Sequence, residues 1–192
     1  MLEPIGMTVA SRGVAGASAP RVGLVVWLAS ELMFFAGLFA AYFALAAANE
    51  PWPPAAVDLP ALRAGLFCGV LVASGVGVYL AARAAAAPDA SAAAGWLGLT
   101  MLAGGIFLAD QVLEYRDTGF GIGTDAFGSI FAILVFFHGL HLLAGLVAMA
   151  VVAGRLLSGS AWAAEGTQLL AYYWYFVILI GIAVYAVLYL IR

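Results

Sequence analysis

The sequence contains little charge and no lysine. Charged residues make up 9% of its 192 residues, whereas an average soluble domain has about 25%. The seven basic residues are all arginines and stand against ten acidic residues, so the formal net charge is −3. So few arginines, spread along the chain, cannot form a basic patch, and we expect no nucleic-acid partner.

Cysteine is nearly absent as well, because Cys68 is the single one. One cysteine cannot form an internal disulfide, and the sequence has no CxxC or Cys/His pattern that would predict a metal site. Cys68 lies within an apolar run, so we predict that it is a small packing residue.

Hydrophobic residues are abundant: they account for 66% of the chain, and the mean hydropathy is +1.11. A helix needs about 20 apolar residues to span a membrane, and five segments are long enough. The sequence therefore predicts an all-α, polytopic membrane protein, a single domain over 1–192 that forms an antiparallel bundle of five transmembrane helices. After an N-terminal tail, 1–21, the predicted spans are about 22–48, 62–83, 95–115, 126–154 and 169–191.

The first span is too long for the h-region of a signal peptide, about 7–15 residues, so we expect it to stay in the protein. The linkers are short, which makes successive helices neighbours. An odd number of spans places the termini on opposite sides of the membrane. Four arginines against three favour a cytoplasmic N-terminus and an outer C-terminus. The four are Arg12, Arg21, Arg83 and Arg155, and the three are Arg63, Arg116 and Arg192.

One acid stands in the middle of the first span, Glu31 in "WLASELMFFAGLFAAYF". An ionisable group there costs roughly 2.5–3.5 kcal/mol on insertion scales. The fourth span carries His138 and His141, which lie on one helical face. At ~1.5 Å per residue, Glu31 lies ~13 Å and His138 ~12 Å from the inner surface. We therefore expect Glu31 and His138 to meet inside the bundle, which would lower the cost of burying both.

Two interpretations of Glu31 stay open: a carboxylate linked to proton movement or to a lipid groove, and a structural hydrogen bond to the fourth helix. His138 and His141 could together bind one metal ion. However, the chain has no other histidine, and Glu31 is the only obvious further donor. We favour structural hydrogen bonding, and predict a buried polar cluster of Glu31, His138 and His141 with no catalytic, cofactor-binding or metal-binding residue.

Polar residues also end the third span, in "ADQVLEYR". Asp110 and Glu114 are four residues apart and share a helical face. We interpret this face as an outer polar face rather than as an ion site, and we assign Gln111 to it as well. Near the start of the fifth span, the run Tyr172–Tyr175 predicts an interfacial aromatic belt. The glycine-rich runs "SGVGVYL" and "AGGIF" predict close helix packing, either within the chain or against a partner.

Five blocks in order resemble subunit III of the haem–copper oxidases, the cytochrome c oxidase family, over essentially the whole chain. They are "VWLASELMFFAGLFAAYF" with Glu31, "PWPP", "QVLEY" with Gln111, Glu114 and Tyr115, "FHGLH" with His138 and His141, and "YYW…FV…LYLIR". The length is similar to the short, five-helix bacterial form, and the pattern is similar to the actinobacterial type. The arginine-rich, lysine-free composition is compatible with a GC-rich genome.

The resemblance implies a non-catalytic membrane subunit of a proton-translocating terminal oxidase in aerobic respiration. Such a subunit packs on subunit I, in a complex that also contains subunit II, binds phospholipid between its helices and supports proton uptake. It carries no haem or copper itself, because both belong to the partner subunits. The resemblance also implies a multi-pass protein of the bacterial cell membrane, and it is compatible with assembly with a cytochrome bc complex.

One block departs from the family pattern. The family's last helix reads Trp-His-Phe-Val-Asp and continues to a later Trp, whereas this chain has Tyr175, Ile178 and Gly181 at the three differing positions. By the depth argument, the missing Asp would lie level with Glu31. This departure leaves open a related subunit of a quinol oxidase or a nitric oxide reductase.

An autonomous small transporter is a further alternative. A transporter is expected to show midplane polar residues on several helices, or broken helices in repeated halves. The sequence shows one glutamate and two histidines on two helices, with no internal repeat. The subunit interpretation is therefore favoured.

Overall fold

The computed structural model describes residues 18–55, 57–87 and 91–191, and these residues form helices joined by short loops. All five predicted spans are present, and each helix is long and apolar enough to cross a membrane. The predicted fold class, an all-α protein with five transmembrane helices, is confirmed. The helices are α1 (Ala19–Ala48), α2 (Ala61–Ala84), α3 (Ser91–Asp117), α4 (Ala126–Leu157) and α5 (Ala163–Tyr185), and α5 continues into a five-residue π-helix, η1 (Ala186–Leu190).

The start of α5 differs most from the prediction, since the helix begins at Ala163 rather than at 169. The prediction relied on hydropathy and so excluded the polar residue Glu165. A carboxylate in the first turn of a helix is favourable, because the N-terminal end of the helix dipole is positive. The helix begins directly after a turn at Gly159, whose φ of +69° suits glycine.

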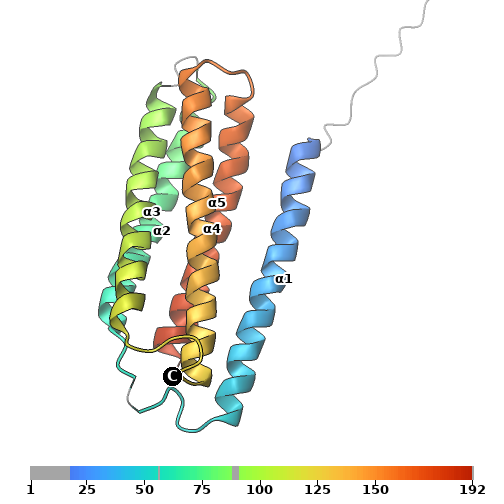
Figure 1. The fold of residues 1–192 in the computed structure, drawn as a ribbon. Helices are drawn as coiled ribbons and strands as arrows, with labels where there is room; N and C mark the ends of the chain where they lie inside the picture. Colours follow the sequence, from blue (N-terminus) through green and yellow to red (C-terminus); the bar gives the residue numbers. More distant parts are fainter. Residues whose placement is uncertain (1–17, 56, 88–90, 192) are drawn as a thin grey trace, which may run out of the picture.

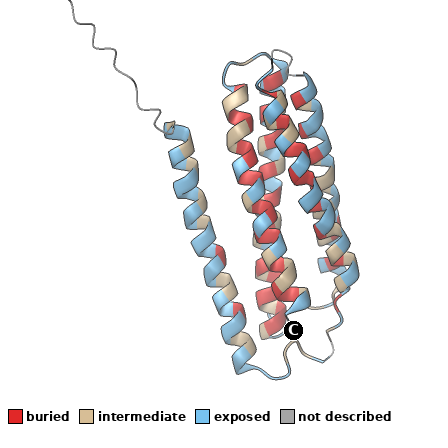
Figure 2. Cartoon of the chain, turned by 180° about the vertical axis from the view of Figure 1, so that it is seen from behind, coloured by how far each residue is buried: buried red, intermediate tan, exposed pale blue. Residues whose placement is uncertain are grey.

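Helices α2, α3, α4 and α5 form a bundle in which each helix contacts two neighbours. Helix α1 lies outside this bundle, as Figure 1 shows, and its main contacts are with α4 and α5. The burial pattern follows the same division. Buried positions are distributed over the four bundle helices (Figure 2), whereas α1 has only two, Phe35 and Tyr42.

Trp174 of α5 lies at the centre of the bundle and is fully buried. Its indole Nε1 donates to Ser74 Oγ of α2 at 2.9 Å. A Cβ atom added at Gly104 of α3 or at Gly145 of α4 would lie 2.8 Å from the Trp174 ring. Both glycines therefore make room for the tryptophan, and at Gly104 the predicted close packing takes place within the chain.

The predicted aromatic belt near the start of α5 is wrong for two of its four residues. Trp174 is fully buried and Tyr173 is 6% exposed, whereas Tyr172 and Tyr175 are exposed. Four consecutive residues of a helix point in different directions, so they cannot all face the membrane surface. Trp174 and Tyr173 are packing residues instead.

The loop between α1 and α2 holds the C-terminal end of α1 against the bundle. Trp52 of this loop packs edge-on against Tyr42 of α1, with ring centroids 5.4 Å apart, and against Phe127 of α4 at 5.2 Å. Two contacts hold the other end of α1. The Ser18 hydroxyl donates to the Glu165 carboxylate at 2.8 Å, and Arg21 donates to the Gln168 side-chain oxygen at 2.5 Å.

Candidate functional site

Glu31 of α1 lies within hydrogen-bond distance of a histidine of α4, and this histidine is His141. Glu31 Oε2 lies 3.1 Å from His141 Nε2. The side chains are 24% and 12% exposed, respectively, so both are partly accessible from the surroundings of the bundle. The predicted contact between helices one and four therefore exists, but the predicted partner, His138, is wrong.

His138 was predicted as the partner from its depth along α4, but depth says nothing about the direction in which a side chain points around the helix axis. His138 and His141 differ in depth by only ~4.5 Å, yet they are rotated by about 60° relative to each other. That rotation turns His141 toward α1, whereas His138 points into the bundle and is 1% exposed. Its Nε2 lies 3.2 Å from the Val177 carbonyl oxygen, and its Nδ1 lies 3.5 Å from Gln111 Nε2.

The contacts of His141 show how protons are distributed in the pair. His141 Nδ1 lies 2.7 Å from the Phe137 carbonyl oxygen. A carbonyl oxygen only accepts hydrogen bonds, so Nδ1 carries a hydrogen. A hydrogen bond between His141 Nε2 and Glu31 Oε2 then requires one more proton, on the ring or on the acid. In either form the pair has no net charge, which makes it far cheaper to bury than a lone carboxylate.

Aromatic side chains surround the pair. The Phe35 ring lies edge-on to the His141 ring at 5.1 Å, and Trp27 stacks on Tyr173 with centroids 5.5 Å apart. The Tyr173 hydroxyl donates to the His141 carbonyl oxygen at 2.8 Å. These contacts fix the position of His141 on α4 and of α1 beside it.

A cleft of about 370 Å³ opens beside the pair, between α1 and α4. Glu31 and His141 are its charged or ionisable lining residues, and the others are mostly apolar or aromatic, among them Trp27, Phe34 and Leu140. A second cleft of about 260 Å³, which shares Trp27 and Tyr173, extends toward the N-terminal end of α1. We call these two together the α1 cleft. Glu31 is thus reachable from a largely apolar space at mid-membrane depth.

The two differing positions early in the last helix face away from Glu31. A Cβ atom on Gly75 of α2 would meet Ile178 Cδ1 at 3.1 Å, and the Tyr175 hydroxyl donates to the Gly75 carbonyl oxygen at 3.0 Å. Residues 175 and 178 therefore pack against α2, on the side of α5 away from α1. Depth alone placed residue 178 level with Glu31, but the rotation of α5 turns this residue toward α2 instead.

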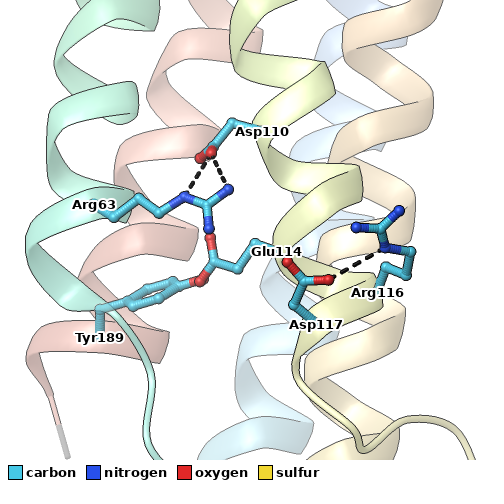
Figure 3. A network of polar contacts seen from close by, with 6 residues as sticks. All are labelled: Arg63, Asp110, Glu114, Arg116, Asp117 and Tyr189. Atoms are coloured by element: carbon cyan, nitrogen blue, oxygen red, sulfur yellow. Dashed lines mark hydrogen bonds and ion pairs between the residues drawn. The ribbon is translucent and has the colours of Figure 1, made fainter.

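A second polar group lies near the C-terminal end of the bundle. Arg63 of α2 forms an ion pair with Asp110 of α3, with 2.6 Å between Nη2 and Oδ1. One turn further along α3, Glu114 accepts a hydrogen bond of 2.7 Å from the Tyr189 hydroxyl. Figure 3 shows Glu114 between Arg63 and Tyr189. We call these four residues the α3 cluster.

The α3 cluster corrects the predicted outer polar face. Asp110 and Glu114 are only 6% and 7% exposed, so they face the bundle interior rather than water. Their spacing of four indicated a shared face but not which way it points. Tyr189 and Arg63 were missed, because each looks like an ordinary residue at the end of a span. Gln111 also points inward: its Nε2 donates to the Val135 carbonyl oxygen at 3.3 Å, and its buried Oε1 has no hydrogen-bond partner.

Within the described parts of the chain, no group of three or more His, Cys, Asp or Glu side chains is arranged to hold a metal ion. Cys68 is a free, buried thiol. It lines a small pocket inside the bundle, beside Ala64 and Asp110.

Comparison with known proteins gives a consistent result. A family model described as "Cytochrome c oxidase subunit III" matches residues 10–191. "Probable cytochrome c oxidase subunit 3" of Nocardia farcinica (strain IFM 10152) is 40% identical over 177 residues, which cover 89% of this chain and 87% of that protein. "Cytochrome c oxidase subunit 3" of Corynebacterium diphtheriae is 36% identical over 194 residues, 95% of each chain. The protein of the same name from Thermostichus vulcanus is 31% identical over 173 residues, 88% of this chain and 86% of that one.

Proposed function

The chain belongs to the cytochrome c oxidase subunit III family, and from this membership we propose that it is a non-catalytic membrane subunit of a proton-translocating terminal oxidase. The electrons pass to oxygen at haem and copper centres in the partner subunits. This chain binds neither group. It acts in aerobic respiratory electron transport by supporting the subunits that do the chemistry.

The observation that carries the proposal is the Glu31–His141 pair in the α1 cleft. Glu31 Oε2 lies 3.1 Å from His141 Nε2, and the pair is partly exposed to an apolar cleft. Acyl chains of phospholipids fit a cleft with apolar walls at this depth. We therefore assign the α1 cleft to lipid and the pair to the support of proton uptake by the oxidase.

The hydrogen bonds of the two histidines support a chain without its own haem or copper. The ring nitrogens of His138 are within hydrogen-bond distance of Val177 and Gln111. Those of His141 are within hydrogen-bond distance of Phe137 and Glu31. A metal ion would have to displace these partners. It would also find too few further ligands nearby, since metal sites of this kind need three or four donors.

Partners and location follow from the same proposal. The chain packs on oxidase subunit I, in a complex with subunit II in the bacterial cell membrane, with lipid and a cytochrome bc complex as further contacts. The N-terminus is cytoplasmic. Among the described arginines, three lie at the end of the molecule where α1 and α5 begin, namely Arg21, Arg83 and Arg155. Two, Arg63 and Arg116, lie at the opposite end, so the excess of arginine favours a cytoplasmic N-terminus. Arg12 and Arg192 lie outside the described residues.

The alternative of a quinol oxidase or nitric oxide reductase subunit rested on Tyr175, Ile178 and Gly181. Residues 175 and 178 face α2 and leave the Glu31–His141 pair intact. The relatives named above are all described as cytochrome c oxidase subunits. We therefore propose the cytochrome c oxidase.

Purification tests the proposal. The chain, tagged at its N-terminus and extracted from its native membrane in mild detergent, should co-purify with a haem-bearing partner that oxidises reduced cytochrome c. Purification without any haem-bearing partner would contradict the subunit assignment. Co-purification with a complex that oxidises quinol but not cytochrome c would contradict the choice of oxidase.

A further inference from the structure

The pocket inside the bundle lies between the α3 cluster and His138. It is lined from α2, α3, α4 and α5, and it has a volume of about 40 Å³. A cavity needs roughly 10–15 Å³ to hold one water molecule. The pocket is therefore large enough for water, but it is too small for a lipid tail or an organic cofactor.

The lining of the pocket is partly polar. It includes Asp110, Gln111, Glu114, His138 and Tyr189. Most of the other lining residues are apolar or aromatic. A dry cavity is expected only where the lining is apolar throughout, whereas a cavity with several polar partners retains water.

Glu114 has acceptor capacity to spare. The Arg63 guanidinium donates to Asp110 and acts on Glu114 through its charge, while Glu114 accepts a hydrogen bond from the Tyr189 hydroxyl. A carboxylate offers about four acceptor positions, so one phenol leaves room for further donors. A buried carboxyl group is costly when its acceptor positions are unfilled, and the adjoining pocket has room for a water molecule that would donate to it.

Gln111 and His138, which also line the pocket, are held in one arrangement. The Val177 carbonyl oxygen requires a hydrogen on His138 Nε2, so His138 Nδ1 is an acceptor when the ring is neutral, and it faces Gln111 Nε2. Among the described residues, the Gln111 side-chain oxygen has no hydrogen-bond partner. The pocket lining therefore includes an acceptor that the described part of the chain does not use.

We propose that this pocket is a water-binding site, in which ordered water donates to the Glu114 carboxyl group and extends toward the Gln111–His138 pair. The site is separate from the α1 cleft, since His138 lines this pocket and His141 lines the cleft. Water here allows two acids, Asp110 and Glu114, to remain inside the bundle with a single arginine. It does not depend on the proposed role in an oxidase.

Hydroxyl-radical labelling by X-rays tests the proposal, because radiolysis of a bound water oxidises the side chains beside it. Two buried sulfur-containing residues form a matched pair, and both oxidise readily. Cys68 lines the pocket, whereas Met149 is fully buried in the apolar core. In the protein purified in lipid nanodiscs with its native partners, Cys68 should be oxidised several-fold faster than Met149. Equal, slow oxidation of both would overturn the proposal.

A pair of variants on α2 separates water from general reactivity. Ala64 is buried and lines the pocket, whereas Ala73 is exposed on the same helix. Ala64→Val should lower the oxidation of Cys68 several-fold, and Ala73→Val should leave it unchanged. Unchanged oxidation in a folded Ala64→Val protein would overturn the proposal. If that variant does not fold, the comparison of Cys68 with Met149 in the unmodified protein still decides.

Discussion

The four bundle helices and α1 are attached to one another by different kinds of contact. In the bundle, glycines of α3 and α4 admit the ring of Trp174 at close range. Helix α1 instead meets α4 and α5 through aromatic side chains, such as Trp27 on Tyr173, and through the Glu31–His141 pair. The difference shows in the acids: Asp110 and Glu114 of the bundle are buried, whereas Glu31 of α1 stays accessible from a cleft. Tight packing of helices keeps lipid and water away from polar side chains, whereas looser aromatic packing leaves a polar site accessible to them.

The largest effect should distinguish two tryptophans. Trp174→Ala removes a fully buried ring and should lower the free energy of unfolding by roughly 3–5 kcal/mol. Trp27→Ala removes a stacked but 44% exposed ring, and its aromatic contact is worth about 0.5–1.5 kcal/mol. Unfolding in mixed micelles of mild detergent and dodecyl sulfate measures both. Equal losses would show that α1 is attached as firmly as the bundle helices.

The next effect concerns residue 178. Ile178→Asp restores the family's acid but places it against Gly75 of α2, so it should cost roughly 2.5–3.5 kcal/mol, as for an acid at the centre of a span. The infrared bands of the Glu31 carboxyl group are identified as those that disappear in Glu31→Gln. Because residue 178 faces away from α1, these bands should have the same position in Ile178→Asp as in the unmodified protein. A shift of those bands would mean that residue 178 and Glu31 are neighbours after all.

Two glycines of α3 should respond in opposite directions. Gly104→Ala pushes a Cβ atom into the Trp174 ring and should cost about 1–3 kcal/mol. Gly98 has nothing within 4 Å of its added Cβ, so Gly98→Ala should stabilise the helix by roughly 0.5–1 kcal/mol. The same unfolding measurement applies to both. Stabilisation by Gly104→Ala would contradict the close approach of α3 and α5.

The smallest effect on stability is expected at Glu31. In Glu31→Gln the amide can donate to His141 Nε2, so the free energy of unfolding should change by less than about 1 kcal/mol. The shared proton is lost, however, and proton uptake by the assembled oxidase should slow while the complex stays intact. Asp117→Asn, at an exposed acid of α3, is the control and should change neither property. A large loss of stability in Glu31→Gln would make the pair structural rather than linked to protons.

Residue types predicted the helices well and their rotation poorly. Runs of about 20 apolar residues are long enough to identify five spans, and only polar helix ends, such as Glu165, blurred the limits. Glu31 and the two histidines stood out because charge is costly in a membrane. Which histidine faces α1 depends on how α4 is rotated. That rotation is decided by packing, such as Gly145 against Trp174, which no spacing within one helix reveals. The inward direction of Glu114 was missed for the same reason.

The contacts of α1 have a consequence for how the protein is made. Glu31 and His141 are 110 residues apart in the chain, and Ser18 and Glu165 are 147 apart. The ribosome therefore delivers α1 to the membrane long before α4 and α5 exist. During that interval Glu31 has no histidine beside it, and a lone acid in hydrocarbon is held in its neutral form. Helix α1 is thus a single span with an uncompensated acid at first, and it can pack against α4 and α5 only after these two helices have been inserted. Substitutions of His141 that remove its contact with Glu31 should consequently increase degradation of the chain by the quality-control proteases of the membrane.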